Sequence, residues 1–229
     1  MFFNLFRKWS DEPSWRLRPS KYSRDNQNNF GGKVMLPQSV LEDLVILQVQ
    51  PPYIFEIAHT DGVMKTHCGV LEFTADETTV TVPNWMYEQL VMDSIEEVEI
   101  KFTVIPVGNF VKLLPHSTDF LEIENPKIEL EHCLRNYQVL TLGDEVLLRF
   151  EEYGPMRFTV KEIEPSLENA IYIVDTDLSV DFCEPLGFKE KVENERTVNK
   201  YLEFVEGSFN PRPIKMKRLG LSFNLRNIR

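Results

Sequence analysis

The sequence predicts a mixed, β-rich fold built as two small lobes. Short runs that alternate apolar and polar residues recur along the chain, and turn signals such as Asp61-Gly62 and Leu142-Gly143-Asp144 separate them. The helical patterns are short, with no helix longer than about four turns. The 229 residues, of which 42% are apolar, suffice for one large domain or two small ones with a real core.

The first lobe is expected over residues 30–115, after a polar and weakly ordered segment at 1–29. One short helix follows Pro37, where Ser39 and Glu42 have capping-box spacing. Another runs from Asn84 to Leu90. Alternation predicts strands at Tyr53–Ala58, Lys65–Thr74, Thr78–Val82, Val98–Val104 and Val111–Leu114. The second and third of these strands look like a pair joined by the turn at residues 75–77.

The second lobe is expected over residues 116–183 and combines a helix with strands. Asn125-Pro126 supplies an N-cap and a first-turn proline. A buried helical stripe follows at Leu130, Cys133, Leu134 and Tyr137. A hairpin around Tyr153-Gly154-Pro155 and a strand at Ala170–Asp175 complete the lobe. Residues 184–229 are expected to form a flexible, basic tail.

Charge is distributed unevenly along the chain. Residues 1–29 carry +3, residues 30–183 carry −18 and residues 184–229 carry +4, within a net charge of −11. The acidic body favours partners with a basic face and disfavours nucleic acid and anionic lipid, although solubility alone also explains it. The last segment, Gly207–Arg229, has six Lys/Arg and no acid, so it is predicted to order on a partner. A nucleic-acid tail is the competing interpretation, and it works against the acidic body.

No catalytic residue, metal site or cofactor is predicted. The two His-Cys pairs, at 67–68 and 132–133, lack zinc-ligand spacing, and small buried thiols explain them better. The sequence has no phosphate loop, nucleotide fingerprint or nucleophile elbow, and no nucleophile, base and orienting group can be assembled. The three cysteines favour a reduced compartment, and no apolar run suits a membrane span or a secretory signal.

Ordered blocks of this sequence resemble a known family. They lie at Phe30–Pro37, Thr66–Phe73 with Pro83–Met86, Asp119–Lys127, Leu134–Asp144 and Asp177–Glu190. Their order and spacing identify the chain, over roughly residues 30–190, as a member of the ubiquitin fusion degradation protein one family. The resemblance implies a double-psi β-barrel lobe followed by a smaller mixed α/β lobe.

The resemblance also implies a function. The family binds ubiquitin chains, pairs with nuclear protein localization protein four and serves valosin-containing protein, the Cdc48-type AAA ATPase. It delivers ubiquitylated clients for unfolding and proteasomal degradation, including clients from the endoplasmic reticulum. The resemblance thus implies that this chain is a non-catalytic adaptor of the cytoplasm and nucleus, which reaches the endoplasmic reticulum surface through its complex. Nucleic-acid binding and membrane insertion are not expected.

Candidate site residues follow from the resemblance. The candidate ubiquitin contacts lie in its most distinctive block and are Leu71, Phe73, Trp85 and Met86. Barrel core is the alternative, and it is favoured for Leu71 and Phe73. The tail resembles the partner-binding segment, and near 204–209 it resembles an ATPase-docking box with one glycine displaced and no leucine. The candidate tail residues are Phe204, Gly207, Leu219, Gly220, Phe223, Arg226 and Asn227.

Two other functions stay open from the sequence. A double-psi barrel hosts many activities, so a diverged enzyme or small-ligand binder is one alternative. A nucleic-acid binder that uses residues 207–229 is the other.

Overall fold

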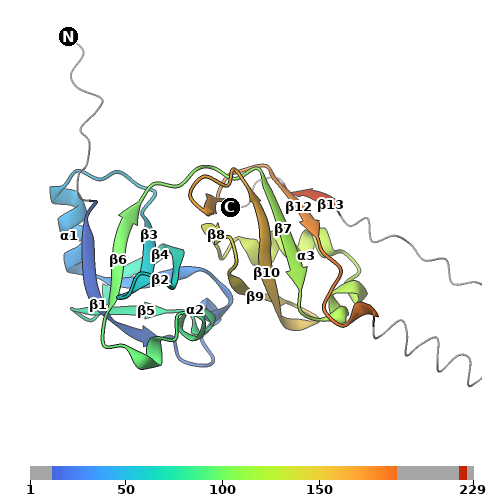
Figure 1. Ribbon diagram of the computed structural model, residues 1–229, viewed down its shortest axis with the longest axis horizontal. Helices are drawn as coiled ribbons and strands as arrows, with labels where there is room; N and C mark the ends of the chain where they lie inside the picture. The colour runs from blue at the N-terminus through green and yellow to red at the C-terminus, as the bar shows by residue number, and fades with distance from the viewer. Residues whose placement is uncertain (1–11, 190–221, 226–229) are drawn as a thin grey trace, which may run out of the picture.

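Two lobes lie side by side in the computed structural model, which describes residues 12–189 and 222–225 (Figure 1). The first lobe is a closed barrel, and the second combines a five-stranded sheet, a two-stranded sheet and a helix. Short helices make up a small part of the described residues. The predicted β-rich fold is therefore confirmed. None of the helices in this described part has the length and apolarity needed to cross a bilayer.

The barrel strands follow the order β1-β5-β2-β4-β3-β6, and β6 pairs with β1 to close the ring. Alternation explains the interior: Val98 and Ile100 of β6 are fully buried, while Glu99 and Lys101, which alternate with them, are not. The strands are β1 (Ser14–Lys21), β2 (Lys33–Pro37), β3 (Ile54–His59), β4 (Lys65–Ala75), β5 (Thr79–Val82) and β6 (Val98–Thr103). The helices of this lobe are η1 (Gln27–Phe30), α1 (Gln38–Ile46), α2 (Asn84–Gln89) and η2 (Met92–Ser94).

The N-terminal strand corrects the expectation of weak order over residues 1–29. β1 pairs in parallel with β5 and antiparallel with β6, so it belongs to the barrel. The reason lies in the alternation of Trp15 and Leu17 with Arg16 and Arg18, which places Leu17 in the core at 5% exposure. Residues 1–11 lie outside the described part of the chain.

The expected pairing of Lys65–Thr74 with Thr78–Val82 is also wrong. β2 lies between these two strands, parallel to β4 and antiparallel to β5. Its fully buried side chains, Val34 and Leu36, fill the barrel interior at this place. The free energy gained by burying these two apolar side chains exceeds the entropic advantage that a short connection gives to a simple hairpin.

The second lobe contains a strand that the sequence assigned to the first. β7 (Phe110–Pro115) pairs with β10 and β12 inside the sheet β13-β12-β7-β10-β9, because Val111 and Leu113 point into the core of the second lobe. The helical stripe of α3 (Pro126–Leu134) is buried as predicted. The other elements are η3 (Thr118–Glu122), β8 (Val139–Thr141), β9 (Glu145–Phe150), β10 (Gly154–Glu164), β11 (Ala170–Tyr172), β12 (Leu178–Phe182) and β13 (Ser222–Leu225).

The C-terminal region enters this sheet at one place. β13 pairs antiparallel with β12, and Phe223 stands opposite Val180. The expected tail over 184–229 therefore contributes a strand to the folded body. The other candidate tail residues, Phe204, Gly207, Leu219, Gly220, Arg226 and Asn227, lie outside the described residues.

Candidate functional site

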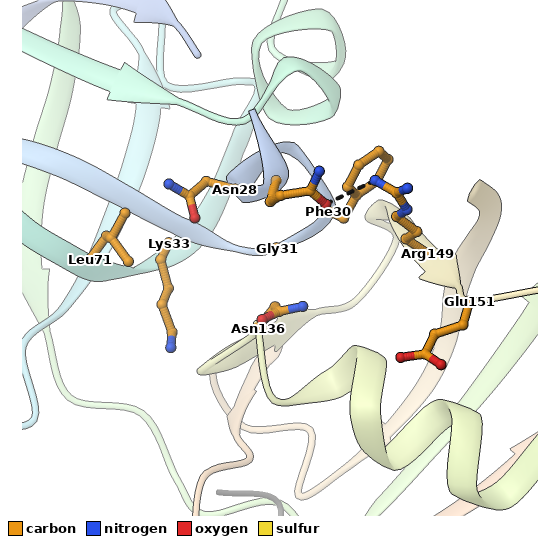
Figure 2. A pocket seen from close by; sticks show the side chains of 9 residues that line it. Asn28, Phe30, Gly31, Lys33, Leu71, Asn136, Arg149 and Glu151 are labelled. Atoms are coloured by element: carbon orange, nitrogen blue, oxygen red, sulfur yellow. Dashed lines mark hydrogen bonds between the residues drawn. The ribbon is translucent and has the colours of Figure 1, made fainter. Parts of the chain in front are cut away.

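An open groove with a volume of about 440 Å³ lies between the two lobes (Figure 2). The barrel lobe contributes residues from η1, the start of β2 and the middle of β4. The second lobe contributes the turn after α3 and the end of β9. The lining residues are Gln27, Asn28, Phe30, Gly31, Lys33, Leu71, Asn136, Arg149 and Glu151.

Two glycines set how closely the lobes approach beneath the groove. A Cβ on Gly31 would lie 2.8 Å from the carbonyl oxygen of Asn136, and a Cβ on Gly32 would lie 2.7 Å from Cδ1 of Tyr137. Instead the Gly32 N–H donates to the Asn136 carbonyl over 3.2 Å. Both positions therefore require glycine, because Gly31 lies against the backbone of Asn136 and Gly32 lies against the ring of Tyr137.

Two buried aromatic residues support the groove from below. Trp85 Nε1 donates to the Gly31 carbonyl over 2.8 Å, and the Tyr137 hydroxyl donates to the Leu147 carbonyl over 2.9 Å. Their ring centroids lie 6.3 Å apart. Burial raises the pKa of Tyr137 well above its ordinary value, so the phenol stays a donor. Trp85 thus positions the glycine segment without reaching the surface.

The cations of the groove differ in how they are held. Arg149 Nη1 donates to Gln27 Oε1 over 2.8 Å, and its guanidinium lies 5.2 Å from the ring centroid of Phe30. Lys33 is half-buried, and burial lowers the pKa of its ammonium group. Within the described residues Lys33 has no ion-pair partner. Figure 2 shows Lys33 and Leu71 on the barrel side of the groove, facing Asn136.

The predicted ubiquitin contacts divide into two pairs. Trp85 and Met86 lie in the core at 2% and 0% exposure, so the structure gives no partner access to them. Leu71 is 38% exposed and lines the groove. Phe73 is half-buried and packs edge-on against Tyr53 at 5.9 Å. The sequence preference for the core is therefore wrong for Leu71, whereas Phe73 packs against the edge of the core cluster and remains half-buried.

The second half of β4 presents Leu71 and Phe73 on one face because side chains of a strand alternate. The same alternation turns Glu72 to the opposite face, whereas Asp76 and Glu77 follow in the turn after β4 and are exposed. This apolar and acidic surface, here called the β4 surface, consists of Tyr53, Leu71, Phe73, Asp76 and Glu77. Its chemistry suits a partner with an apolar patch and basic surroundings.

Further along the lobe boundary, a cluster of hydrogen-bonded polar residues joins the lobes. This group, here called the closed cluster, consists of Thr66, His67, Gln89, Thr141 and Asp144. Thr66 Oγ1 donates to Asp144 Oδ2 over 2.5 Å, and Gln89 Nε2 donates to Asp144 Oδ1 over 2.7 Å. The His67 backbone N–H donates to Thr141 Oγ1 over 3.1 Å. Burial raises the pKa of Asp144 to about 6 and lowers the pKa of His67 to about 4. Each hydrogen bond crosses from the barrel lobe to the second lobe, so the cluster holds them together.

The described residues hold no group of three or more His, Cys, Asp or Glu side chains placed to bind a metal ion. Burial raises the pKa of Cys68 and of Cys133 to about 12, which disfavours a reactive thiolate at either position. What the groove and the β4 surface offer is hydrogen-bond donors, cations and exposed apolar area. This combination is typical of surfaces that contact another macromolecule.

Sequence reasoning missed most of the groove. Asn28, Lys33, Asn136 and Arg149 come from segments up to about 120 residues apart, and no spacing rule connects them. The Gly31-Gly32 pair was the available signal, because adjacent glycines often mark close backbone approach.

Models of known families match most of the chain. Residues 12–106 match ubiquitin fusion degradation protein UFD1, N-terminal subdomain 1, and residues 107–185 match N-terminal subdomain 2 of the same protein. The junction between the two matches falls in the connection between β6 and β7. The matched segments thus coincide with the two lobes.

Curated proteins are similar over the same region. The ubiquitin fusion degradation protein 1 homolog of Dictyostelium discoideum is 40% identical over 160 residues, which cover 70% of this chain and 48% of the relative. Ubiquitin fusion degradation protein 1 of Saccharomyces cerevisiae is 40% identical over 73% of this chain and 46% of its own length. The Mus musculus protein named ubiquitin recognition factor in ER-associated degradation protein 1 is 37% identical over 77% of this chain and 55% of its own length. The chain spans about half the length of the curated relatives it matches.

Proposed function

Because the chain belongs to the ubiquitin fusion degradation protein UFD1 family, we propose that it is a non-catalytic adaptor that binds ubiquitin chains. The mouse relative is named for ubiquitin recognition in ER-associated degradation. In this proposal the chain pairs with the nuclear protein localization partner and delivers ubiquitylated clients to a Cdc48-type AAA ATPase. It acts in the cytoplasm and nucleus, and at the endoplasmic reticulum surface through that complex.

The topology supports the double-psi form of the barrel. Two parallel pairs, β1 with β5 and β2 with β4, occur in a ring whose other pairs are antiparallel. β2 lies between two strands that follow each other in sequence. Interleaved connections of this kind are what a double-psi barrel requires, because each parallel pair needs a crossover.

The observation that carries the proposal is the β4 surface. Leu71 and Phe73 present apolar area, the turn that follows β4 carries Asp76 and Glu77, and residues 30–183 as a whole carry a charge of −18. Ubiquitin, as the family resemblance implies, offers an apolar patch with basic surroundings. Opposite charges raise the rate of encounter within a Debye length of about 8 Å at physiological salt.

A contact of this size binds one ubiquitin weakly. Selectivity for chains then comes from simultaneous contacts with two ubiquitins of one chain, which raise the overall affinity by roughly 10²–10⁴. The enzymatic alternative has less support, because the hydroxyl, imidazole and carboxyl groups that do meet, at Thr141, His67 and Asp144, are buried between the lobes and offer a substrate no access.

The test is a titration of the full chain with tetra-ubiquitin and with monoubiquitin. Tetra-ubiquitin should bind at least about tenfold more tightly, and Leu71→Ser with Phe73→Ser should weaken both interactions. Val63→Ser is the matched control, since Val63 is 80% exposed in the turn between β3 and β4 and lies outside the β4 surface. Equal affinity for both ligands would contradict chain recognition. Equal effects of the control and the double variant would contradict the assigned surface.

A further inference from the structure

The outer edge of β12 has hydrogen-bonding groups that its neighbour β7 does not use. The Ser179 N–H donates to the Asn109 carbonyl over 2.9 Å, and the Cys183 N–H donates to the Leu113 carbonyl over 2.9 Å. In a strand, consecutive backbone groups point to opposite edges. The backbone groups of Leu178, Val180 and Phe182 therefore point away from β7.

One of these three positions is satisfied locally. The Phe182 N–H donates to the Asp181 carboxylate over 2.8 Å, so the strand-pairing edge effectively ends there. Leu178 and Val180 remain, and their side chains are fully buried, which fixes the backbone in place. A short segment of strand is all that this edge can accept.

The chain's own C-terminal strand occupies this edge. β13 lies beside β12 (Figure 1). It pairs Leu225 with Leu178 and Phe223 with Val180, which are the two positions left open. The four paired residues, Ser222–Leu225, carry no charge, and Asp181 of β12 already pairs with Lys112 over 3.6 Å. Backbone hydrogen bonds, and not charge, therefore hold the strand on this edge.

The pairing is short enough to exchange. β13 has four residues, and residues 190–221 separate it from the last residue described before it. A strand of this length is held by few backbone hydrogen bonds, each of which contributes only about 0.5–1.5 kcal/mol. An equivalent strand from another molecule can compete because strand addition uses main-chain groups that any extended segment carries.

We propose that the outer edge of β12 is a strand-addition site for a short, extended segment, which Ser222–Leu225 fills in cis and the same segment of a second copy of the chain can fill in trans. Under the proposed function, on which this consequence rests, Phe223 also belongs to the segment that binds the nuclear protein localization partner. Pairing with β12 and binding to that partner then exclude each other, and partner binding frees the edge.

Amide hydrogen exchange of the free full-length chain tests the site without ubiquitin or partner. The double variant Phe223→Pro/Leu225→Pro removes both backbone donors opposite β12. The Leu178 and Val180 amides should then exchange about tenfold faster or more, while the Ser179 amide, which bonds to Asn109, keeps its protection. Ile228→Pro, outside the paired residues, is the matched control and should change neither rate.

A synthetic peptide with the sequence of residues 218–229 tests the trans interaction. Added to the double-proline variant, it should restore protection at Leu178 and Val180, whereas a peptide with the same two prolines should not. Unchanged exchange in the variant would overturn the cis pairing, and failure of the peptide to protect would overturn the trans site. Protection that depends on protein concentration in the wild type would also overturn the cis pairing, because the strand would then come from a second copy. None of these outcomes bears on ubiquitin binding, so this inference and the proposed function can fail separately.

Discussion

Two stretches of the same lobe boundary have opposite character. In the closed cluster, Asp144 is 3% exposed and receives hydrogen bonds from Thr66 and Gln89. In the open groove, Lys33 and Leu71 face solvent and have few partners. Both stretches lie between the same two lobes. The closed cluster is buried, as are Trp85 and Tyr137 beneath the groove, whereas the groove itself is open to solvent. We infer that one stretch holds the lobes together while the other remains available for binding.

The largest expected effect comes from removing the aromatic support. Trp85→Ala should lower the free energy of unfolding by about 3–5 kcal/mol, because it empties a fully buried site and leaves the Gly31 carbonyl without its donor. Chemical denaturation of the full chain measures it. Trp85→Phe, which keeps most of the volume, should cost less. A stability change near zero for the alanine variant would place Trp85 on a surface rather than in the core.

The closed cluster should show two opposite pH dependences. Asp144 has a raised pKa, so the folded chain keeps a proton that the unfolded chain loses between pH 3.8 and about 6. This contribution to stability falls as the pH rises through that window. His67 has a lowered pKa, so between about pH 4 and 6.5 the unfolded chain binds a proton that the folded chain does not. The His67 contribution therefore rises with pH and opposes that of Asp144.

Single variants should separate the two contributions. Relative to the wild type, the free energy of unfolding of Asp144→Asn should rise as the pH rises from about 4 to 6. That of His67→Gln should fall over the same range. Each change should be roughly 3 kcal/mol at most. Denaturation curves at a series of pH values give both slopes. Slopes of the same sign in the two variants would show that the cluster does not bury these groups as described.

The smallest expected effect on stability lies in the groove. Lys33→Glu should change the free energy of unfolding by no more than about 0.5 kcal/mol, since the ammonium group has no ion-pair partner among the described residues. It should raise tetra-ubiquitin affinity a few-fold at low salt, because it removes a cation beside Leu71, and the gain should fade at high salt. Weaker binding at every salt concentration would instead indicate that the groove receives an acidic ligand segment.

Sequence reasoning identified the elements with strong local patterns. The stripe Leu130, Cys133, Leu134 and Tyr137 and the hairpin at Gly154 needed only periodicity and turn chemistry. It missed β1, because three cations and Pro19 concealed the alternation of Trp15 and Leu17. It misplaced β7, since an isolated strand gives no indication of which sheet will bury it.

The candidate site was harder to predict from the sequence than the fold, for a related reason. Leu71 and Trp85 have similar apolar character in the sequence, and only the packing of the folded chain decides that the first is exposed and the second is buried. The groove depends on residues from both lobes. Its geometry follows from the contact of Gly31 and Gly32 with Asn136 and Tyr137, which is a long-range property.

The glycine contact also determines how freely the lobes can move. Gly31 meets the main chain of Asn136 and Gly32 meets the ring of Tyr137, so the lobes are separated by no slack at this place and we expect them to move together. Two lobes that move together lose little freedom when one ligand contacts both. Under the proposed function, they would favour polymers whose repeating units are spaced to match the two lobes.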